Sequence, residues 1–533
     1  MTTQLVDAVV IGSGPNGLVA ANVLADAGWD VLLVEAQTTV GGAVRSAEVT
    51  APGFTSDLFS AFYPLAAASP VISDLDLPSH GLRWVHAPEV LAHPLAGGDC
   101  AVLSTDPDRT AENLDGFAAG DGAAWLAMVE HWKQVRDPLL DALFTPFPPI
   151  RPVLTLLRRV GAAGALELAR LATLPVRRLG TETFAGAGGP LLLTGNALHT
   201  DIPPDAAGSG MFGWLLAMLG QDVGFPVPQG GAQRLADALA ARFTAAGGAI
   251  RTGLPITSVQ INRGRATGVL AADGTRILAR RGVLADVAAT TLYTELVDAR
   301  HLPAGLPRAI RRFDWDHSTL KVNWALRSPI PWRSTGARGA GTVHLGVDVD
   351  GFVDAAADLT VGRMPGRPFI LLGQMTTADP TRSPAGTESA WAYTHVPADA
   401  TAQALDRQVA VVERTVEQLA PGFGDLVIGR HVQTPADLRA ADANLVRGTT
   451  NGGTASIHQQ LVLRPVPGLG RPETPVPGLY LASAGAHPGG GVHGACGWNA
   501  ARAALAADGR TGRLRQRLAH TAWERLLPAE GPG

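Results

Sequence analysis

The sequence predicts an α/β fold built on a parallel sheet, and three observations lead to this prediction. Residues 8–11 are an unbroken apolar run, as expected for a strand buried on both faces. A glycine-rich turn, a helix-forming segment and a second apolar run, Val31–Val34, follow directly. A similar junction of strand, glycine-rich loop and helix returns near residue 480. At 533 residues, the chain is long enough for a second domain beside this one.

The first turn has the glycine spacing of a dinucleotide-binding loop. Its residues are Gly12, Ser13, Gly14, Pro15, Asn16 and Gly17. The first glycine permits the turn, the second lets the backbone approach a pyrophosphate, and the third allows close packing of helix on strand. Residues 18–27 form the expected helix, whose amino end directs free N–H groups toward phosphates. Glu35 lies 18 residues after Gly17, near the spacing of the acid that binds a ribose hydroxyl.

Two later regions extend the same domain. Residues 40–46 hold Gly41, Gly42 and Arg45, which suit a second wrap around a pyrophosphate. Residues 228–231 (Pro-Gln-Gly-Gly) precede a helix-like run, 232–246. The strand-like runs that follow are Ala249–Arg251, 256–261, 266–271, 275–279 and 282–285. The Asp273-Gly274 turn between two alternating runs predicts a hairpin.

The glycine-dense loop near the C-terminus identifies the cofactor, because the first turn alone fits nicotinamide and flavin equally. Residues 478–497 join a short strand to this loop, and the helix-like run 498–507 follows. Such dense glycines imply that the backbone passes against a flat or bulky group. A helix amino end beside the loop favours negative charge by about 0.3–1 kcal/mol. An anionic reduced flavin is such a group, so the sequence predicts FAD.

These segments resemble the FAD-dependent phytoene desaturase superfamily, and in particular its phytoene dehydrogenase-related oxidoreductases. The resemblance rests on the first turn with Glu35, on Gly41-Gly42, on residues 228–231 and above all on residues 486–492 (AHPGGGV). Two departures, Ser483 in place of glycine and Trp498 in place of a small residue, argue against a strict carotenoid desaturase.

The resemblance implies a Rossmann-like FAD-binding domain assembled from separated segments and interleaved with an α+β substrate domain that has a mixed sheet. The FAD-binding pieces are 1–70, 225–290 and 455–510, the substrate pieces are 71–224 and 291–454, and 511–533 is a C-terminal tail. The expected cofactor-binding residues are Gly12, Gly14, Pro15, Asn16, Gly17, Glu35, Gly41, Gly42, Arg45, Val259, Gly485, His487, Gly491 and Val492.

Three side chains are candidates for catalysis. Ser318–Leu326 alternates like a half-buried strand, with Lys321 and Asn323 on one face. If that face lines the cavity under the flavin, Lys321 positions a water or takes a proton; the alternative is a solvent-exposed face. His487 and His493 flank the glycine loop and serve either proton transfer or the orientation of the loop.

One further run bears on the substrate. Trp391, Tyr393 and His395 share a face of another strand-like run, which forms either an aromatic wall for an apolar ligand or ordinary core.

The resemblance implies a desaturase or dehydrogenase that removes two electrons from an apolar, isoprenoid-like substrate and forms a double bond. The sequence shows no second dinucleotide-binding site that could hold a nicotinamide cofactor, so oxygen or a quinone is the expected electron acceptor. Two alternatives stay open. One is a flavin amine oxidase on the same plan, and the other is a redox-silent role as an isomerase or a flavin-bound interaction protein.

Composition excludes several other classes. The 43 basic and 47 acidic residues give a net charge of −4, which offers no general attraction for nucleic acid. Cys100 and Cys496 form no C-x-x-C motif, so a disulfide framework or a zinc cluster is not expected, and no metal site is predicted. The first strand begins too early for a signal peptide, and no apolar run reaches the ~18 residues of a membrane span, so a cytoplasmic protein is expected.

One segment leaves membrane association open. Residues 139–179 are rich in leucine and proline and carry six arginines against Asp141 and Glu167. Apolar runs beside Arg158 and Arg159 suit a membrane-surface helix that touches anionic headgroups. The alternative is an ordinary amphipathic helix that covers the substrate domain.

Overall fold

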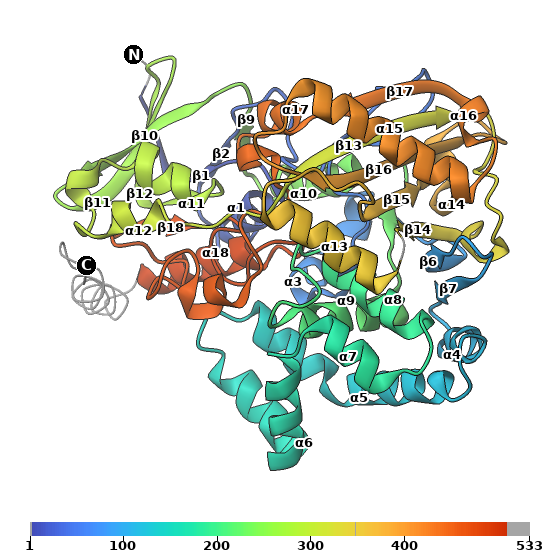
Figure 1. Cartoon of the computed structure of the whole chain (residues 1–533). Coiled ribbons are helices and arrows are strands. Elements are labelled where there is room, and N and C mark those ends of the chain that lie inside the picture. Colours follow the sequence, from blue (N-terminus) through green and yellow to red (C-terminus); the bar gives the residue numbers. More distant parts are fainter. Residues whose placement is uncertain (1–2, 347, 509–533) are drawn as a thin grey trace.

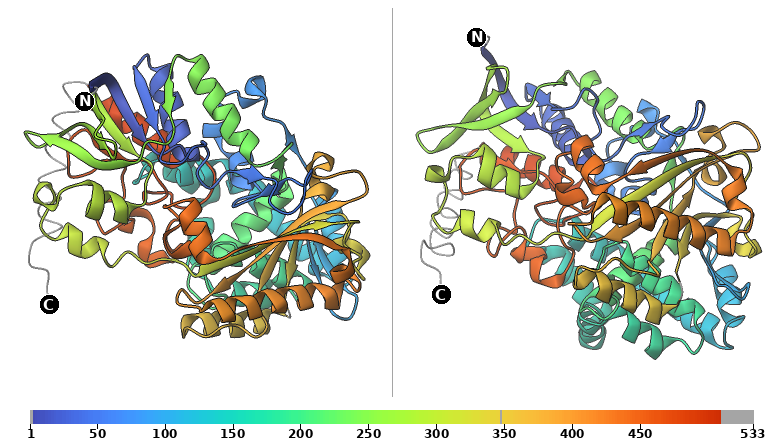
Figure 2. Two further views of the ribbon diagram at one scale, coloured as in Figure 1. Left: turned by 90° about the horizontal axis from the view of Figure 1, so that it is seen from above. Right: turned by 45° about the horizontal axis from the view of Figure 1, so that its top comes forward.

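The computed structural model describes residues 3–346 and 348–508, and its two large sheets have seven strands each among these residues. Figure 1 shows one sheet on the left and the other on the right, with a group of helices below. Figure 2 shows that both sheets draw strands from segments far apart in the chain. This is the predicted α/β architecture, in which a sheet with a parallel centre is interleaved with a second, mixed sheet.

The first sheet has a parallel centre in the spatial order β9-β2-β1-β12-β18. Its strands are β1 (Thr3–Ile11), β2 (Val31–Val34), β9 (Ala249–Arg251), β10 (Ile256–Asn262), β11 (Arg265–Ala271), β12 (Arg276–Ala285) and β18 (Leu479–Leu481). The long β12 pairs with β1 on one side, and on its other side its first half pairs with β11 and its second half with β18. The predicted hairpin at Asp273-Gly274 joins β11 to β12, where Thr275 N–H donates to the Asp273 side chain.

Both faces of this sheet are buried, which explains its unbroken apolar strands. Val10 and Leu33 face a core shared with the helices α1 (Pro15–Asp26), α10 (Gln233–Ala245) and α18 (Ala495–Ala507). Val9 and Leu32 face a second core on the opposite side. Successive residues therefore alternate between two apolar layers.

The second sheet is mixed, with the spatial order β17-β13-β16-β15-β14-β6-β7. Its strands are β6 (Glu89–Pro94), β7 (Cys100–Leu103), β13 (Ser318–Leu326), β14 (Ala340–Leu345), β15 (Ile370–Gln374), β16 (Glu388–Val396) and β17 (Val427–Gln433). The β6–β14 pair is parallel and the other pairs are antiparallel. Helix α15 (Ala402–Leu419) covers its outer face, where its apolar side chains meet Leu320, Val322 and Trp324.

The prediction that Ser318–Leu326 is half-buried was wrong, because both faces of β13 are buried. Lys321 is 2% exposed and Asn323 is 0% exposed. The polar face is covered from the other side by the segment around Asp57, whose carbonyl accepts a hydrogen bond from the Lys321 ammonium. The sequence alone does not show this cover, which comes from more than 260 residues away.

The remaining elements fill the space around the sheets. The lower helical group in Figure 1 consists of α4 (Pro107–Asp115), α5 (Asp121–Phe144), α6 (Ile150–Leu171), α7 (Val176–Thr183), α8 (Gly188–Leu198) and α9 (Ser209–Val223). Shorter helices are α2 (Pro64–Ala68), α3 (Pro70–Ser73), α11 (Ala289–Thr291), α12 (Leu306–Ile310), α14 (Met375–Ala378), α16 (Phe423–Leu426) and α17 (Pro435–Ala441), and α13 (Val349–Thr360) is longer. The remaining strands form two short antiparallel ribbons, β3–β4 (Ser46–Ala47, Ser56–Asp57) and β5–β8 (Trp84–Val85, Val227–Pro228). The predicted tail, 511–533, lies outside the described residues.

Candidate flavin site and substrate cavity

The first glycine-rich turn joins β1 to α1, and its glycines are required by close contacts. Gly12 has φ +95°, and a Cβ there would lie 2.6 Å from the Asp286 carbonyl oxygen. A Cβ on Gly17 would lie 2.1 Å from the Gly12 carbonyl oxygen. Gly14 is the N-cap of α1 and Pro15 is its first residue, so the amino end of the helix faces the turn, where the Gly17 N–H donates to the Asp286 carboxylate.

Glu35 lies at the end of β2, beside this turn. One carboxylate oxygen accepts hydrogen bonds from the Ser13 N–H (2.8 Å) and hydroxyl (2.7 Å), and the other accepts from the Gln37 N–H (2.8 Å). Glu35 is 8% exposed. These bonds hold the carboxylate at the edge of the site, where a ribose-binding acid is expected.

The second glycine pair packs directly on the first turn. The Gly41 N–H donates to the Ser13 carbonyl at 3.0 Å, and a Cβ on Gly42 would lie 2.9 Å from the Gly14 Cα. Arg45 holds this loop through hydrogen bonds to the carbonyls of Gly42 (2.8 Å) and Ala441 (2.7 Å). The two loops therefore form one continuous cradle of backbone.

The C-terminal glycine loop closes the cradle from the other side. A Cβ on Gly497 would lie 1.8 Å from the Asn16 carbonyl oxygen, so α18 packs tightly against the start of α1. The buried Asn16 side-chain oxygen has no hydrogen-bond partner among the described residues. A close-packed backbone cradle with the basic Arg45 and an unpaired amide oxygen fits a dinucleotide.

Arg464 connects the C-terminal loop to the rest of the site. Its guanidinium donates to the carbonyls of Ala484 (2.8 Å), Thr454 (2.9 Å) and Gly452 (2.9 Å). The side chain is 1% exposed, and burial lowers the pKa of Arg464 to about 10. The sequence analysis missed this residue, because nothing in its neighbourhood signals a partner 20 residues away.

A cavity of about 370 Å³ lies between the cradle and the second sheet. Predicted residues that line it are Gly14, Pro15, Asn16, Gly42, Lys321, Gly485, Gly491 and Val492. Apolar and aromatic side chains dominate its far wall, with Leu65, Phe212, Leu216, Phe225, Leu371, Trp391 and Tyr393. The Trp391 and Tyr393 rings are stacked, with centroids 6.0 Å apart and planes inclined by 7°. Trp391 and Tyr393 of the predicted aromatic face therefore line the cavity, whereas His395 is not among the described residues that line it.

Lys321 projects from β13 into this cavity. Its ammonium donates to the Asp57 carbonyl and lies 5.1 Å from the centre of the Trp391 ring. Burial lowers the pKa of Lys321 to about 7, against the opposing effect of Asp57. The amine is therefore able to change protonation state near neutral pH.

The two predicted histidines lie behind the glycine loop and are not among the described residues that line the cavity. Burial lowers the pKa of both His487 and His493 to about 4, so both rings are neutral at physiological pH. The His493 Nδ1 accepts a hydrogen bond from the Ala495 N–H at 3.0 Å, and its ring lies 5.5 Å from that of Phe144. Of the two roles predicted for these histidines, this placement favours orientation of the glycine loop over proton transfer.

Val259 also lies away from the cavity. It is in β10, which pairs antiparallel with β11 at the edge of the first sheet. Its side chain is 6% exposed and packs in the same apolar core as Val9 and Leu32.

The structure adds a buried carboxylate that the sequence analysis missed. Asp286 follows β12 directly, lines the cavity and accepts a hydrogen bond from the Gly17 N–H at 2.8 Å. Burial raises the pKa of Asp286 to about 8, with the Gly17 hydrogen bond opposing the shift and the nearby Asp442 and Glu35 carboxylates contributing to it. Its position at the carboxyl end of a parallel strand was the available signal, because ligands bind at that edge.

Asp286 predicts a pH dependence of cofactor binding. Below pH 8 its carboxyl is neutral and accommodates a phosphate, whereas the ionised form repels it. We expect FAD affinity to fall about tenfold for each pH unit above 8. Titration of apoprotein with FAD between pH 6.5 and 9.5 measures this, and Asp286→Asn should flatten the profile. The exposed-turn variant Asp273→Asn is the control, and an unchanged slope in Asp286→Asn would contradict the prediction.

A second group that the sequence analysis missed is a cluster of buried histidines at the end of the cavity. His199 lines the cavity, and its Nε2 lies 2.7 Å from the His344 Nε2. The His395 Nε2 lies 2.6 Å from Asp201. Burial opposes the charged ring, but the Asp201 carboxylate raises the pKa of His395 above its ordinary value. The members come from separate segments, so no local spacing pointed to them.

The family described as flavin containing amine oxidoreductase matches residues 16–505 of the chain. The chain is 31% identical to the rat protein "Pyridine nucleotide-disulfide oxidoreductase domain-containing protein 2", with 93% of this chain and 92% of the relative covered. It is 25% identical to a limonene dehydrogenase chain of Castellaniella defragrans, over 93% and 94% of the two chains. It is 23% identical to a neurosporene-forming phytoene desaturase of Cereibacter sphaeroides, over 94% of each chain.

Solved structures share the fold at low identity. An oxidoreductase from Methanosarcina mazei superposes with a TM-score of 0.63 at 16% identity, covering 95% of this chain and all of the other. Putrescine oxidase bound to putrescine gives a TM-score of 0.60 at 16% identity, over 95% and 99% of the chains. Cyclohexylamine oxidase from Brevibacterium oxydans gives 0.54 at 17% identity, over 98% and 99%.

Proposed function

The chain belongs to the family of flavin containing amine oxidoreductases, and from that premise we propose that it desaturates an apolar small molecule. It is an FAD-dependent oxidoreductase. The proposed reaction removes two electrons from adjacent carbon atoms of the substrate and forms a double bond. Oxygen or a quinone is the proposed acceptor of these electrons.

The observation that carries the proposal is the composition of the cavity wall. Of the described residues that line it from β13, β15 and β16, only Lys321 is charged; the others are Thr319, Leu371, Trp391 and Tyr393. Such a wall gains free energy by covering an apolar ligand and offers no carboxylate to a cationic one. Relatives named for limonene and phytoene, both hydrocarbons, support the same substrate class.

The residues of the chain have three tasks in this reaction. Phe212, Leu216 and Trp391 hold the substrate and exclude water. FAD, when bound, supplies the site that accepts a hydride from one substrate carbon. Lys321, as the neutral amine, accepts the proton that leaves the neighbouring carbon, and the electron pair of that C–H bond becomes the new double bond.

The pKa of Lys321 predicts a pH profile for the half-reaction. Since the neutral amine is the base, we expect the rate of flavin reduction to rise with pH to a plateau, with its midpoint near pH 7. One unit below the midpoint, only about a tenth of the amine is neutral. Anaerobic stopped-flow mixing between pH 5.5 and 9 measures this rate. A rate that is constant or falls with pH would exclude Lys321 as the base.

A second candidate is oxidation of an amine. The stacked Trp391 and Tyr393 rings on the cavity wall could hold an ammonium group through cation–π contacts, and solved amine oxidases share the fold. Against this, the Lys321 side chain already covers the Trp391 ring, with its nitrogen 5.1 Å from the ring centre.

Anaerobic reduction of the flavin separates these functions. The purified holoprotein is mixed with terpenoid or polyene hydrocarbons in one series and with primary or diamine substrates in another. Bleaching of the flavin absorbance by hydrocarbons alone supports desaturation, and bleaching by amines alone supports the oxidase. If neither reduces the flavin, a redox-silent role is favoured and the proposed function is wrong.

A further inference from the structure

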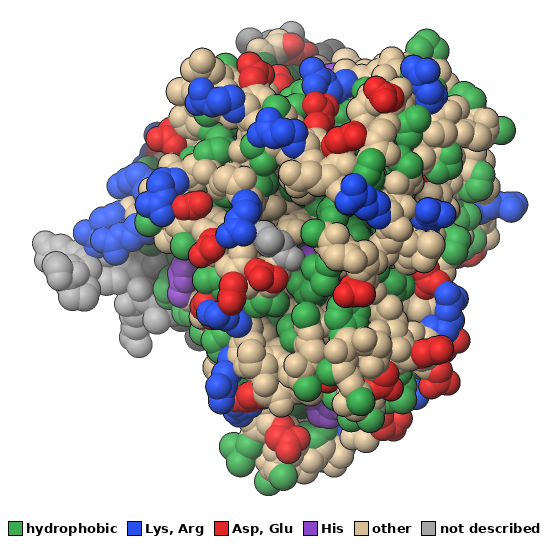
Figure 3. Space-filling model, turned by 45° about the vertical axis from the view of Figure 1, so that its right-hand side comes forward, with side chains coloured by type: hydrophobic (Ala, Val, Ile, Leu, Met, Phe, Trp, Pro, Cys, Tyr) green, Lys and Arg blue, Asp and Glu red, His purple; other side chains and the backbone are tan. Residues whose placement is uncertain are grey.

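Helix α6 presents an unusual apolar stripe to solvent. It projects from the lower end of the molecule in Figure 1. In its first half, Ile150, Val153, Leu154 and Leu157 are 62%, 38%, 45% and 43% exposed. At the helical period, these four side chains lie within an arc of about 100°. Figure 3 also shows hydrophobic side chains at this lower end.

Basic side chains border the stripe. Arg151 and Arg158 lie on one edge of it, with Arg159 behind them, and all three are exposed. None of them forms an ion pair with any described residue. On the other edge, Leu156 and Val160 pack against the helical core. The helix is thus held from one side, while its apolar stripe and unpaired arginines stay available.

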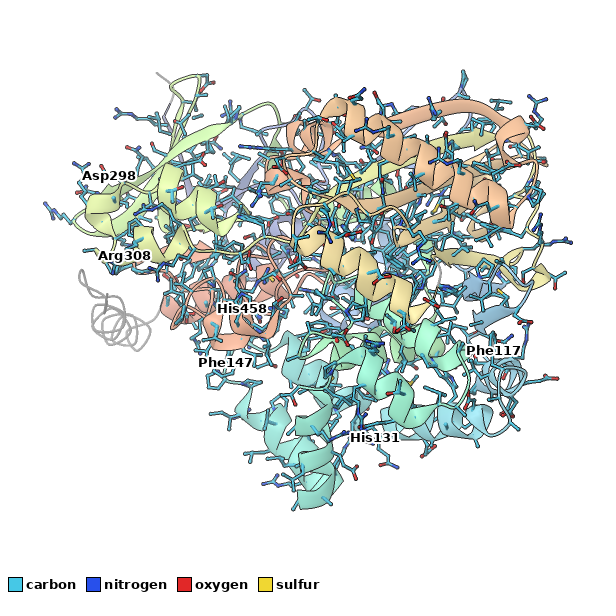
Figure 4. The ribbon with its side chains drawn as sticks, in the orientation of Figure 1. Phe117, His131, Phe147, Asp298, Arg308 and His458 are labelled. Atoms are coloured by element: carbon cyan, nitrogen blue, oxygen red, sulfur yellow. The ribbon has the colours of Figure 1, made fainter. Side chains whose placement is uncertain are left out.

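A second exposed apolar segment lies close to the start of α6. In the loop 457–462, Ile457, Leu461 and Val462 are 48%, 49% and 39% exposed. A Cβ on Gly470 would lie 2.5 Å from the Val462 Cα, and the next residue, Arg471, donates to the Phe147 carbonyl at 3.3 Å. Phe147 is three residues before α6, and Figure 4 labels it together with His458 of the loop.

These two segments concentrate the exposed apolar surface. Among the described residues, thirteen large hydrophobic side chains are exposed, and eight of them belong to α6 or to the loop 457–462. Of the other five, Leu5 and Leu278 are neighbours on β1 and β12, and Leu126, Val361 and Ile428 lie on separate elements. We call residues 150–159 and 457–462 together the docking face.

The docking face adjoins the cavity. Two residues here line the cavity: Gln460, which lies within the loop, and Ala455, which lies two residues before it. Val492 of the glycine loop also lines it. A ligand that leaves the docking face therefore has a short path to the cavity.

We propose that the docking face binds the surface of an anionic lipid bilayer, and that the substrate passes between the bilayer and the cavity beside the loop 457–462. The apolar stripe suits the acyl region, and the unpaired arginines suit anionic headgroups. No helix within the described residues has both the length and the apolar composition needed to cross a bilayer. The passage of substrate rests on the proposed function, whereas the binding of the bilayer does not.

Vesicle sedimentation tests the surface without any turnover. Holoprotein is spun with vesicles of phosphatidylglycerol and phosphatidylcholine in equal parts, and separately with pure phosphatidylcholine vesicles. We expect binding to the anionic vesicles, weakened by high salt. Leu154→Glu with Leu157→Glu should reduce the bound fraction at least about tenfold, and Arg158→Glu with Arg159→Glu should remove the preference for anionic vesicles. Val361→Glu, at a 60% exposed site outside both segments, is the matched control.

Each outcome either supports or overturns the proposal. Retained flavin absorbance shows that the variants are folded. Wild-type protein that stays in the supernatant with both vesicles, or a double leucine variant that sediments like wild type, overturns it. Self-association that the same variant abolishes would assign the face to a second copy of the chain and also overturns it. With substrate supplied in vesicles, faster flavin reduction in the wild type than in the leucine variant, with equal rates in detergent, supports the passage.

Discussion

Replacing Lys321 by methionine is expected to slow reduction of the bound flavin by about 100-fold or more. Methionine matches the length and volume of the side chain but carries no amine, so the proton of the substrate has no acceptor. FAD should stay bound, because the Lys321 amine contacts Asp57 and Trp391, which lie outside the glycine loops. The rate is measured by anaerobic stopped-flow absorbance with a substrate that reduces the wild-type flavin.

The chain offers a matched control for this variant. Its two lysines are Lys133 and Lys321, and the Lys133 side chain is 64% exposed on α5. Lys133→Met should reduce the flavin at the wild-type rate. Lys321→Arg should be slow at every pH, because a guanidinium stays protonated. Equal rates for Lys321→Met and wild type would show that another group, or water, takes the proton.

The second large effect is expected at the first glycine turn. Replacing Gly17 by valine should give protein that is purified without FAD and stays colourless after FAD is added. A Cβ there would lie 2.1 Å from the Gly12 carbonyl oxygen, so α1 must move away from β1 and the cradle opens. The measurements are flavin absorbance after purification and titration with added FAD.

The stability of this variant must be separated from its affinity for FAD. Gly97→Val is the control, since nothing lies within 4 Å of a Cβ at that position, and it should bind FAD normally. Gly17→Ala, the milder variant, keeps the prediction testable if valine prevents folding. Circular dichroism then reports the fold and flavin titration reports the site. Full FAD content in both Gly17 variants would mean that the turn does not form the cradle.

The sequence predicted the parts of the site that depend on local covalent geometry. The strand, turn, helix and second strand predicted for residues 8–34 are present, although β1 begins earlier, at Thr3, and α1 earlier, at Pro15, and Glu35 lies beside the turn. The period of two residues correctly located Trp391 and Tyr393 on one face, and that face lines the cavity. These features follow from glycine spacing and strand alternation, which are properties of short segments.

The same reasoning failed where a partner lies far away in the chain. The polar face of β13 was expected to be half-buried, but residues near Asp57 cover it. Arg464 and the pair of His199 and His344 gave no signal, since each acts only through contacts that folding creates. For Asp286 a signal existed, namely its position directly after a buried parallel strand.

By itself, the sequence determined that this protein has a dinucleotide cradle, because only glycine tolerates the backbone approach that a pyrophosphate requires. The identification of FAD followed from the density of glycines in the C-terminal loop and was confirmed by the family of the chain. Only the tertiary structure decided which side chains meet the substrate cavity and how they are charged. The physical reason is that burial and neighbouring charges set the pKa of groups such as Lys321 and Asp286, and both arise from segments hundreds of residues apart.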